Sequence, residues 1–109
     1  MKEINNIKDY QTIIQGEKPA LIDFYADWCG PCQALLPTVE LLAQQHADKI
    51  NIVKVNVDKN KELAAHFGVK SIPALFFVKN GEITAQFNGV QSAQFLDEKI
   101  SQFTEILHH

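Results

Sequence analysis

Several features that would assign a chain to a specialised class of protein are absent from this sequence. It has no run of basic residues and a formal net charge of −3, so a nucleic-acid partner is not expected. No stretch approaches the roughly 20 apolar residues that a membrane-spanning helix needs. Residues 1–6 contain no apolar segment of a secretory signal, which favours the cytosol, although a mature form that had lost its signal would look the same. No internal repeat, linker or low-complexity segment is found.

The remaining composition is that of an ordinary soluble globular domain. Hydrophobic residues make up 46% of the chain and charged residues 21%. A chain of 109 residues can bury a core without disulfide or metal staples. We therefore expect a single domain over residues 1–109, in which His108 and His109 are either native or the remnant of a purification tag.

Cysteine is scarce, and its two positions are the most informative in the chain. Cys29 and Cys32 are separated by only two residues, follow the apolar run Ala20–Ala26 and precede a segment with helical periodicity. A strand that ends at a Cys-x-x-Cys opening a helix places a thiol at the helix N-terminus, where the thiolate is favoured. In the cytosol such a lone pair is more often catalytic or metal-binding than structural. The pattern therefore indicates a reversible dithiol–disulfide site.

Hydrophobic periodicity and turn residues divide the chain into alternating helices and strands. The helices are predicted over residues 7–15, 31–46 and 59–66 and from Ser92 onward, and the strands over 20–26, 50–57, 74–78 and, beyond the Asn80-Gly81 hairpin turn, along Ile83, Ala85 and Phe87. The last helix is expected to turn Leu96, Ile100, Phe103 and Leu107 inward. A short first strand is predicted at 2–5, and Pro37 is expected to kink the second helix. This order predicts an α/β fold, with a mixed sheet of about five strands between about four helices.

Four separated features resemble the thioredoxin family, and the resemblance covers nearly the whole chain. They are residues 23–32 with their Trp-Cys-Gly-Pro-Cys string, the helix proline Pro37, Ser-Ile-Pro at 71–73, and Phe-Val-Lys-Asn-Gly-Glu at 77–82 with Gly89 beyond it. The Trp-Cys-Gly-Pro-Cys string with an Ile-Pro at this distance is a highly specific combination. The resemblance implies a thioredoxin fold and the activity of a protein-disulfide reductase that contributes to cell redox homeostasis.

Thiol chemistry and the resemblance together suggest roles within this motif. Cys29 is expected to be the nucleophile, because only a thiolate attacks a disulfide. Cys32 is expected to be the resolving thiol, which attacks the mixed disulfide and leaves the pair oxidised. Gly30 permits close backbone approach and Pro31 restricts the turn. In the family, Gly-Pro between the cysteines accompanies reducing activity, whereas oxidising relatives and isomerases usually carry a histidine there.

Asp23 is the one charged residue in the apolar run Ala20–Ala26. Because the apolar residues of this run do not alternate with polar ones, they indicate a strand covered on both faces. Burial of a carboxylate raises its pKa, and a raised pKa beneath a dithiol suits a general base that takes the Cys32 proton through a water. By resemblance, Asp23 matches the family's buried acid and Lys54 the lysine that pairs with it. The alternative is that Asp23 lies at a strand end and faces water.

A docking surface is expected around the Cys29 sulfur. Ile72-Pro73 resembles the family's cis-proline, which would place the Ile72 backbone where it can hydrogen-bond a substrate strand; the alternative is an ordinary trans turn. The expected shallow apolar rim, suited to weak docking of many proteins, comprises Trp28, Gly30, Pro31, Ile72, Pro73, Gly89 and Val90. For Trp28 the alternative is packing in the core.

Metal and cofactor sites are not expected. His46 and His66 invite a metal interpretation with the cysteines, but zinc usually takes four ligands, and both histidines suit packing or helix capping. We expect a cytoplasmic monomer, because no secretory signal is found and nothing in the sequence calls for an oligomer. The resemblance implies that it acts on protein disulfides and accepts electrons from a flavin-containing thioredoxin reductase that uses NADPH. The alternatives are a non-catalytic binding or chaperone module, and a disulfide oxidant or isomerase.

Three positions depart from the family pattern without removing a reacting group. Gln33 stands where the family often has Lys or Arg, Tyr25 where many members have a second tryptophan, and Ala74 where Thr is frequent. The loss of a positive charge at Gln33 is expected to influence partner choice.

Overall fold

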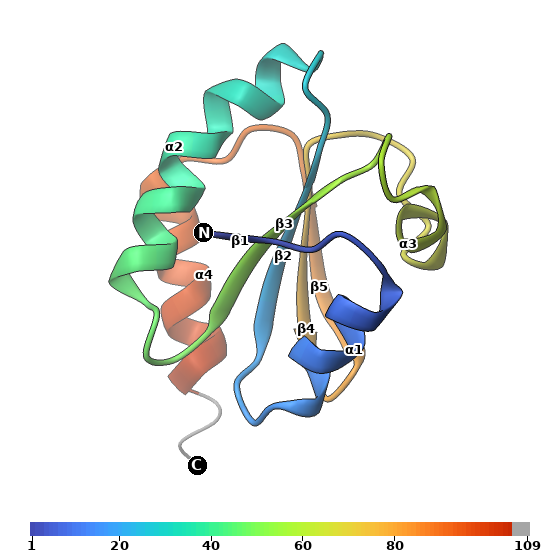
Figure 1. Cartoon of the computed structure of the whole chain (residues 1–109). Coiled ribbons are helices and arrows are strands. Elements are labelled where there is room, and N and C mark those ends of the chain that lie inside the picture. The colour runs from blue at the N-terminus through green and yellow to red at the C-terminus, as the bar shows by residue number, and fades with distance from the viewer. Residues whose placement is uncertain (106–109) are drawn as a thin grey trace.

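The computed structural model describes residues 1–105, and Leu107, His108 and His109 lie outside them. Its elements are β1 (Lys2–Glu3), α1 (Ile7–Gln15), β2 (Ala20–Tyr25), α2 (Gly30–Gln45), β3 (Asn51–Asn56), α3 (Lys61–His66), β4 (Ala74–Lys79), β5 (Glu82–Asn88) and α4 (Ala93–Glu105). The strands form one sheet in the order β1-β3-β2-β4-β5, in which β1, β3 and β2 are parallel and β4 is antiparallel to both β2 and β5. Helices α2 and α4 cover one face of the sheet, and α1 and α3 cover the other (Figure 1). The predicted α/β class and mixed sheet are confirmed.

Short polar side chains set where the helices begin. Asn6 caps α1 by accepting the N–H of Asp9 at 2.8 Å, and Ser92 caps α4 by accepting the N–H of Phe95 at 3.1 Å. Helix α3 begins two residues later than predicted, because Asn56 Oδ1 accepts the N–H groups of both Asp58 and Lys59 and holds them in a turn. Helix α2 continues through Pro37 as a single element.

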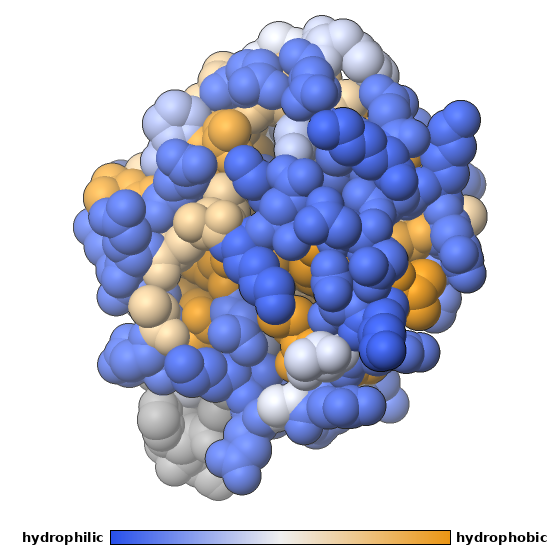
Figure 2. All heavy atoms as spheres, viewed as in Figure 1, coloured by the Kyte–Doolittle hydropathy of each residue, from blue (hydrophilic) through white to orange (hydrophobic). Residues whose placement is uncertain are grey.

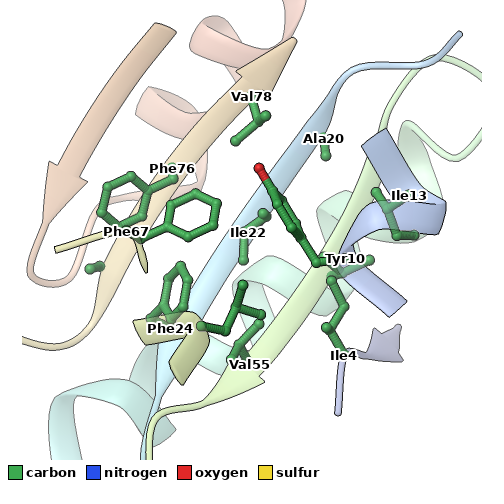
Figure 3. Close-up of a cluster of buried hydrophobic side chains, with 13 residues drawn as sticks. Ile4, Tyr10, Ile13, Ala20, Ile22, Phe24, Val55, Phe67, Phe76 and Val78 are labelled. Atoms are coloured by element: carbon green, nitrogen blue, oxygen red, sulfur yellow. The ribbon is translucent and has the colours of Figure 1, made fainter. Parts of the chain in front are cut away.

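The sheet separates two hydrophobic cores, and β2 contributes to both. All six residues of β2 are buried, as predicted for a strand covered on both faces. The core beneath α1 and α3 is rich in aromatic rings: Phe24, Phe67 and Phe76 lie with ring centroids 5.1–5.4 Å apart (Figure 3). The core beneath α2 and α4 contains Leu21, Leu35, Val39, Leu42, Ile50, Ile52, Leu75, Phe77, Leu96 and Ile100.

The hairpin between β4 and β5 has the predicted turn but an unpredicted irregularity. Asn80 and Gly81 both have positive φ, 53° and 78°, as a two-residue hairpin turn requires. A register shift at Phe77 and Val78 then pairs Ile83 with Val78 but Ala85 with Phe77. Because Val78 and Phe77 belong to opposite cores, Ile83 does not share a face with Ala85 and Phe87.

The outer surface is largely polar on the face seen in Figure 2, with hydrophobic areas separated by hydrophilic side chains. Over residues 1–105, no helix combines the length and apolarity needed to cross a bilayer.

Candidate redox site

The two cysteines lie where β2 leads into α2, at the edge of the sheet formed by the C-terminal ends of β2 and β3. Their Cα atoms are 5.2 Å apart, and a disulfide bond joins them, so the structure shows the oxidised state. Cys29 is the N-cap residue of α2, and its Sγ accepts the backbone N–H of Cys32 at 3.2 Å. Pro31 occupies the first turn, where its missing N–H breaks no helical hydrogen bond. The sulfur of Cys29 therefore faces the positive end of the helix dipole, as predicted.

The surroundings of the pair are apolar and nearly closed to solvent. Cys29 is 5% exposed and Cys32 is 1% exposed. They pack with Tyr25 and Ala26, and with the half-buried Ile72. Cys29 Sγ lies 4.0 Å from the carbonyl oxygen of Ile72, and the Ile72–Pro73 peptide bond is cis. The backbone of Ile72 thus lies beside the sulfur, and the trans alternative is wrong.

Two further segments carry residues that were expected to belong to the rim. Trp28 is 72% exposed, and its Nε1 donates to Asp58 Oδ2 at 2.8 Å, so the alternative of packing in the core is wrong. Gly89, with φ 84°, donates its N–H to the carbonyl of Pro73 at 2.8 Å and brings the exposed Val90 to this loop. Among the other residues expected in the rim, Gly30 and Pro31 are exposed, Ile72 is half-buried and Pro73 is buried. Exposed apolar side chains next to a redox sulfur suit transient docking.

Asp23 lies inside the sheet, two residues before Tyr25 on β2. It is 1% exposed, and neither carboxyl oxygen has a hydrogen-bond partner among residues 1–105. Burial raises the pKa of Asp23 to about 7, although the charge of Lys54 lowers it in part. The alternative of a carboxylate facing water is wrong, and the predicted burial and direction of the pKa change agree with the structure.

Lys54 interacts with Asp23 less directly than predicted. The two residues are register partners on β3 and β2, yet the carboxylate that Lys54 Nζ meets within 4.0 Å is that of Glu3 on β1. The Tyr25 hydroxyl donates to the same Glu3 oxygen at 2.5 Å, and Lys54 Nζ lies 5.6 Å from the centroid of the Tyr25 ring. Burial first, and then the Glu3 carboxylate, raise the pKa of Tyr25. Sequence reasoning missed Glu3, because only the pairing of β1 with β3 brings it near Lys54.

The remaining candidates lie apart from the cysteine pair. His46 Nε2 is 2.7 Å from Asp97 Oδ1, which links the end of α2 to α4. The His66 ring packs near Tyr10 and Phe67, with centroids 5.9 and 5.6 Å away. Within the described part of the chain, no three His, Cys, Asp or Glu residues are grouped to hold a metal ion. Both histidines therefore have packing or capping environments.

The departures from the family pattern occupy defined places. Gln33 lies in the first turn of α2 with its Nε2 3.4 Å from the carbonyl oxygen of Ala26. Ala74 begins β4 and pairs with Phe24 and Asn88. Tyr25 makes the hydrogen bond to Glu3 described above. Each leaves the cysteine pair in place.

Comparison with known proteins agrees with this geometry. The family model for thioredoxin matches residues 2–102. The chain is 43% identical over 93 residues to a thioredoxin of Alicyclobacillus acidocaldarius subsp. acidocaldarius, covering 85% of this chain and 89% of the relative. It is 40% identical over 107 residues to a thioredoxin of Haemophilus influenzae, covering 92% of this chain and 100% of the relative. The structure is similar to that of Fasciola hepatica thioredoxin, with a TM-score of 0.86 at 33% identity, over 94% of this chain and 98% of that one.

These relatives are thiol–disulfide oxidoreductases, and the same type of cysteine pair is present in this chain at disulfide distance. Cys29 and Cys32 are thus a redox-active centre, and their setting supports disulfide reductase activity. The chain belongs to the thioredoxin family.

Proposed function

We propose that this chain reduces disulfide bonds in client proteins, with Cys29 as the attacking thiol and Cys32 as the resolving thiol. The observation that carries this order is the hydrogen bond from the Cys32 N–H to Cys29 Sγ at the start of α2. In the reduced protein this N–H and the helix N-terminus favour the Cys29 thiolate over the thiol. The helix contributes about 0.3–1 kcal/mol, up to roughly 2 kcal/mol when the charge is partly buried, which corresponds to a lowering of the Cys29 pKa by a few tenths of a pH unit up to about 1.5. Cys32 lies one turn further into the helix and is more deeply buried.

The reaction proceeds by two thiol–disulfide exchanges. The Cys29 thiolate attacks one sulfur of the client disulfide, so that a mixed disulfide forms and the other client sulfur leaves as a thiolate. Cys32 then loses its proton and attacks Cys29 Sγ, which breaks the mixed disulfide and releases the second client thiolate. Two electrons pass to the client, and both client thiolates take up protons. The Cys29–Cys32 disulfide is the oxidised product of this cycle.

Asp23 serves in this proposal as the acceptor of the Cys32 proton, acting through a water. A carboxyl group with a pKa of about 7 is divided between its acid and base forms near neutral pH, as efficient proton transfer requires. Its two unpartnered oxygens leave it free to accept a proton. Lys54, its register partner, adjusts this pKa through its charge.

The client is expected to dock on the rim, whose exposed and half-buried members are Trp28, Gly30, Pro31, Ile72, Gly89 and Val90, with the buried Pro73 beneath them. An extended client segment would pair with the backbone of Ile72, beside the sulfur of Cys29. The exposed faces of Trp28 and Val90 would contribute nonspecific apolar contact. Such a surface suits many clients bound weakly.

Membership of the family supports a proposal for the cellular setting of this chain. We propose a cytoplasmic monomer that acts without a bound cofactor and is returned to its dithiol form by an NADPH-dependent, flavin-containing thioredoxin reductase.

An insulin-reduction assay tests this function. With dithiothreitol as reductant, the chain is expected to accelerate the precipitation of the insulin B chain, and the Cys29→Ser, Cys32→Ser double variant is expected to lose the acceleration. Activity that survives in the double variant would instead indicate a binding or chaperone module. With NADPH and a thioredoxin reductase replacing dithiothreitol, NADPH consumption tests the proposed electron donor. A redox potential near that of oxidising relatives would reassign the chain as an oxidant or isomerase.

A further inference from the structure

Three ionisable residues lie in one row across neighbouring parallel strands. Glu3 on β1 is the register partner of Lys54 on β3, and Lys54 is the register partner of Asp23 on β2. Registered residues on adjacent strands direct their side chains to the same face of a sheet. The row therefore places one ammonium group between two carboxyl groups. It lies on the face that α2 and α4 cover, because Leu21 and Ile52, two residues before Asp23 and Lys54, belong to the core on that face.

Lys54 is engaged at the Glu3 end of this row. Its Nζ lies 4.0 Å from Glu3 Oε1 and 5.6 Å from the centroid of the Tyr25 ring. The Tyr25 hydroxyl donates to the same Glu3 oxygen at 2.5 Å and fixes the carboxylate in place. The side chains of Lys54 and Glu3 retain 20% and 29% of their exposure, so this ion pair forms where water still solvates both charges.

Asp23, at the other end of the row, has no hydrogen-bond partner for either oxygen among residues 1–105. The charged group that acts on it comes from β3, namely Lys54, with Glu3 from β1 behind it. The other elements packed on this face contribute Leu75 from β4, Leu35 and the disulfide-bonded Cys32 from α2, and Leu96 and Ile100 from α4. The lysine has a long flexible side chain, so the position of its ammonium group along the row determines how strongly Asp23 is held in its ionised form.

We propose that Glu3 is a positioning residue for the redox reaction: with Tyr25 it holds Lys54 at the β1 end of the row and prevents a direct ion pair between Lys54 and Asp23. Asp23 is then free to take up the proton that Cys32 releases. Without the Glu3 charge, Lys54 turns towards Asp23 and stabilises its carboxylate, which becomes a weaker base. This inference rests on the role proposed above for Asp23.

The Asp23 carboxyl carbon, followed by NMR as a function of pH in the oxidised protein, reports the effect directly. Glu3→Gln keeps the shape of the side chain and its oxygen acceptor for Tyr25 but removes the charge. We expect Glu3→Gln to lower the Asp23 pKa by about one pH unit, which is the lower end of the decrease that a nearby cation causes in the pKa of a carboxyl group. Glu82→Gln is the matched control, because Glu82 begins the other edge strand, β5, and is exposed; it is expected to leave the Asp23 titration unchanged. An unchanged or higher Asp23 pKa in Glu3→Gln would overturn the proposal.

A second background separates positioning from the direct field of the Glu3 charge. In Lys54→Gln, the further change Glu3→Gln is expected to leave the Asp23 pKa where it is, because no ammonium group remains to be redirected. A shift as large as that in the wild-type background would show that Glu3 acts without Lys54 and would refute the positioning role.

The release rate of a mixed disulfide, measured across the titration of Asp23, links this row to catalysis. Glu3→Gln is expected to move the pH profile of release by the same amount and direction as the Asp23 pKa, and to have no effect on the profile in Asp23→Asn. A release rate that is indifferent to Asp23→Asn would defeat the role of Asp23 in the reaction, whereas the NMR titration would still decide how Glu3 acts on it.

Discussion

The burial of Asp23 predicts an unusual dependence of stability on pH. For this residue the folded-state pKa is about 7, whereas the ordinary value is 3.8. Between these values the native state binds a proton that the unfolded state has released, so the free energy of unfolding decreases as the pH rises. A carboxylate in a salt bridge has the opposite effect: its folded-state pKa is lowered, so the free energy of unfolding increases as the pH rises.

The size of the effect follows from the same two values. One bound proton gives a slope of about 1.4 kcal/mol per pH unit, so a rise of roughly three units removes about 4 kcal/mol once Asp23 is fully ionised. Asp23→Asn replaces the carboxyl group with an amide of nearly the same shape that does not titrate. Any packing or hydrogen-bonding penalty of the amide is the same at every pH, so the pH dependence isolates the ionisation of Asp23.

Urea unfolding of the oxidised protein, followed by far-ultraviolet circular dichroism, measures this free energy. The stability of Asp23→Asn relative to the wild type is expected to rise by about 4 kcal/mol between about pH 4 and pH 8. Asp48→Asn, on the exposed segment after α2, is the matched control for exchanging a carboxyl group for an amide. A stability difference between Asp23→Asn and the wild type that does not change with pH would show that Asp23 is not a buried group with a raised pKa.

Three further predictions concern the order of attack, docking and the core. Cys32→Ser is expected to accumulate covalent adducts of client proteins on Cys29 that reducing agent releases, detected on non-reducing gels; failure to recover any mixed disulfide would contradict the assigned order of attack. Trp28→Ala is expected to raise KM for protein disulfides with little change in kcat, because the ring is 72% exposed; an unchanged KM would remove Trp28 from the docking surface. Phe24→Ala is expected to reduce the free energy of unfolding by about 3–5 kcal/mol, measured in urea, and a loss below 1 kcal/mol would contradict its place in the aromatic core.

Local sequence signals predicted most of the fold, because residues within the helices and strands and at their ends mark where these elements begin and end. The spacing of apolar residues and the glycine at 16 marked α1 at its observed bounds, and the Asn80-Gly81 turn marked the hairpin. The apolar run in β2, in which Asp23 is the one charged residue, indicated burial on both faces and so predicted that Asp23 is buried. The thioredoxin motif supplied the cysteine pair and the cis bond before Pro73.

What the sequence did not reveal depends on contacts between distant segments. The bulge that moves Ile83 to the other face arises from the pairing of β4 with β5 and has no local mark. The partner of Lys54 was missed for a similar reason, since Glu3 is 51 positions away and meets it only through the register of β1 on β3. The indole hydrogen bond from Trp28 to Asp58 likewise requires the loop after β3 to lie beside the active-site loop.

Titration of Cys29 in the reduced protein tests whether the start of α2 stabilises its thiolate, on which the proposed reaction depends. The rate of iodoacetamide alkylation, with Cys32→Ser confining the reaction to one thiol, reports the thiolate fraction as the pH is varied. We expect Cys29 to be alkylated at neutral pH with a pKa about one pH unit or more below the roughly 8.5 of a free cysteine. A Cys29 that resists alkylation at neutral pH, or whose pKa equals or exceeds that of a free cysteine, would contradict the proposal that Cys29 is the attacking thiolate.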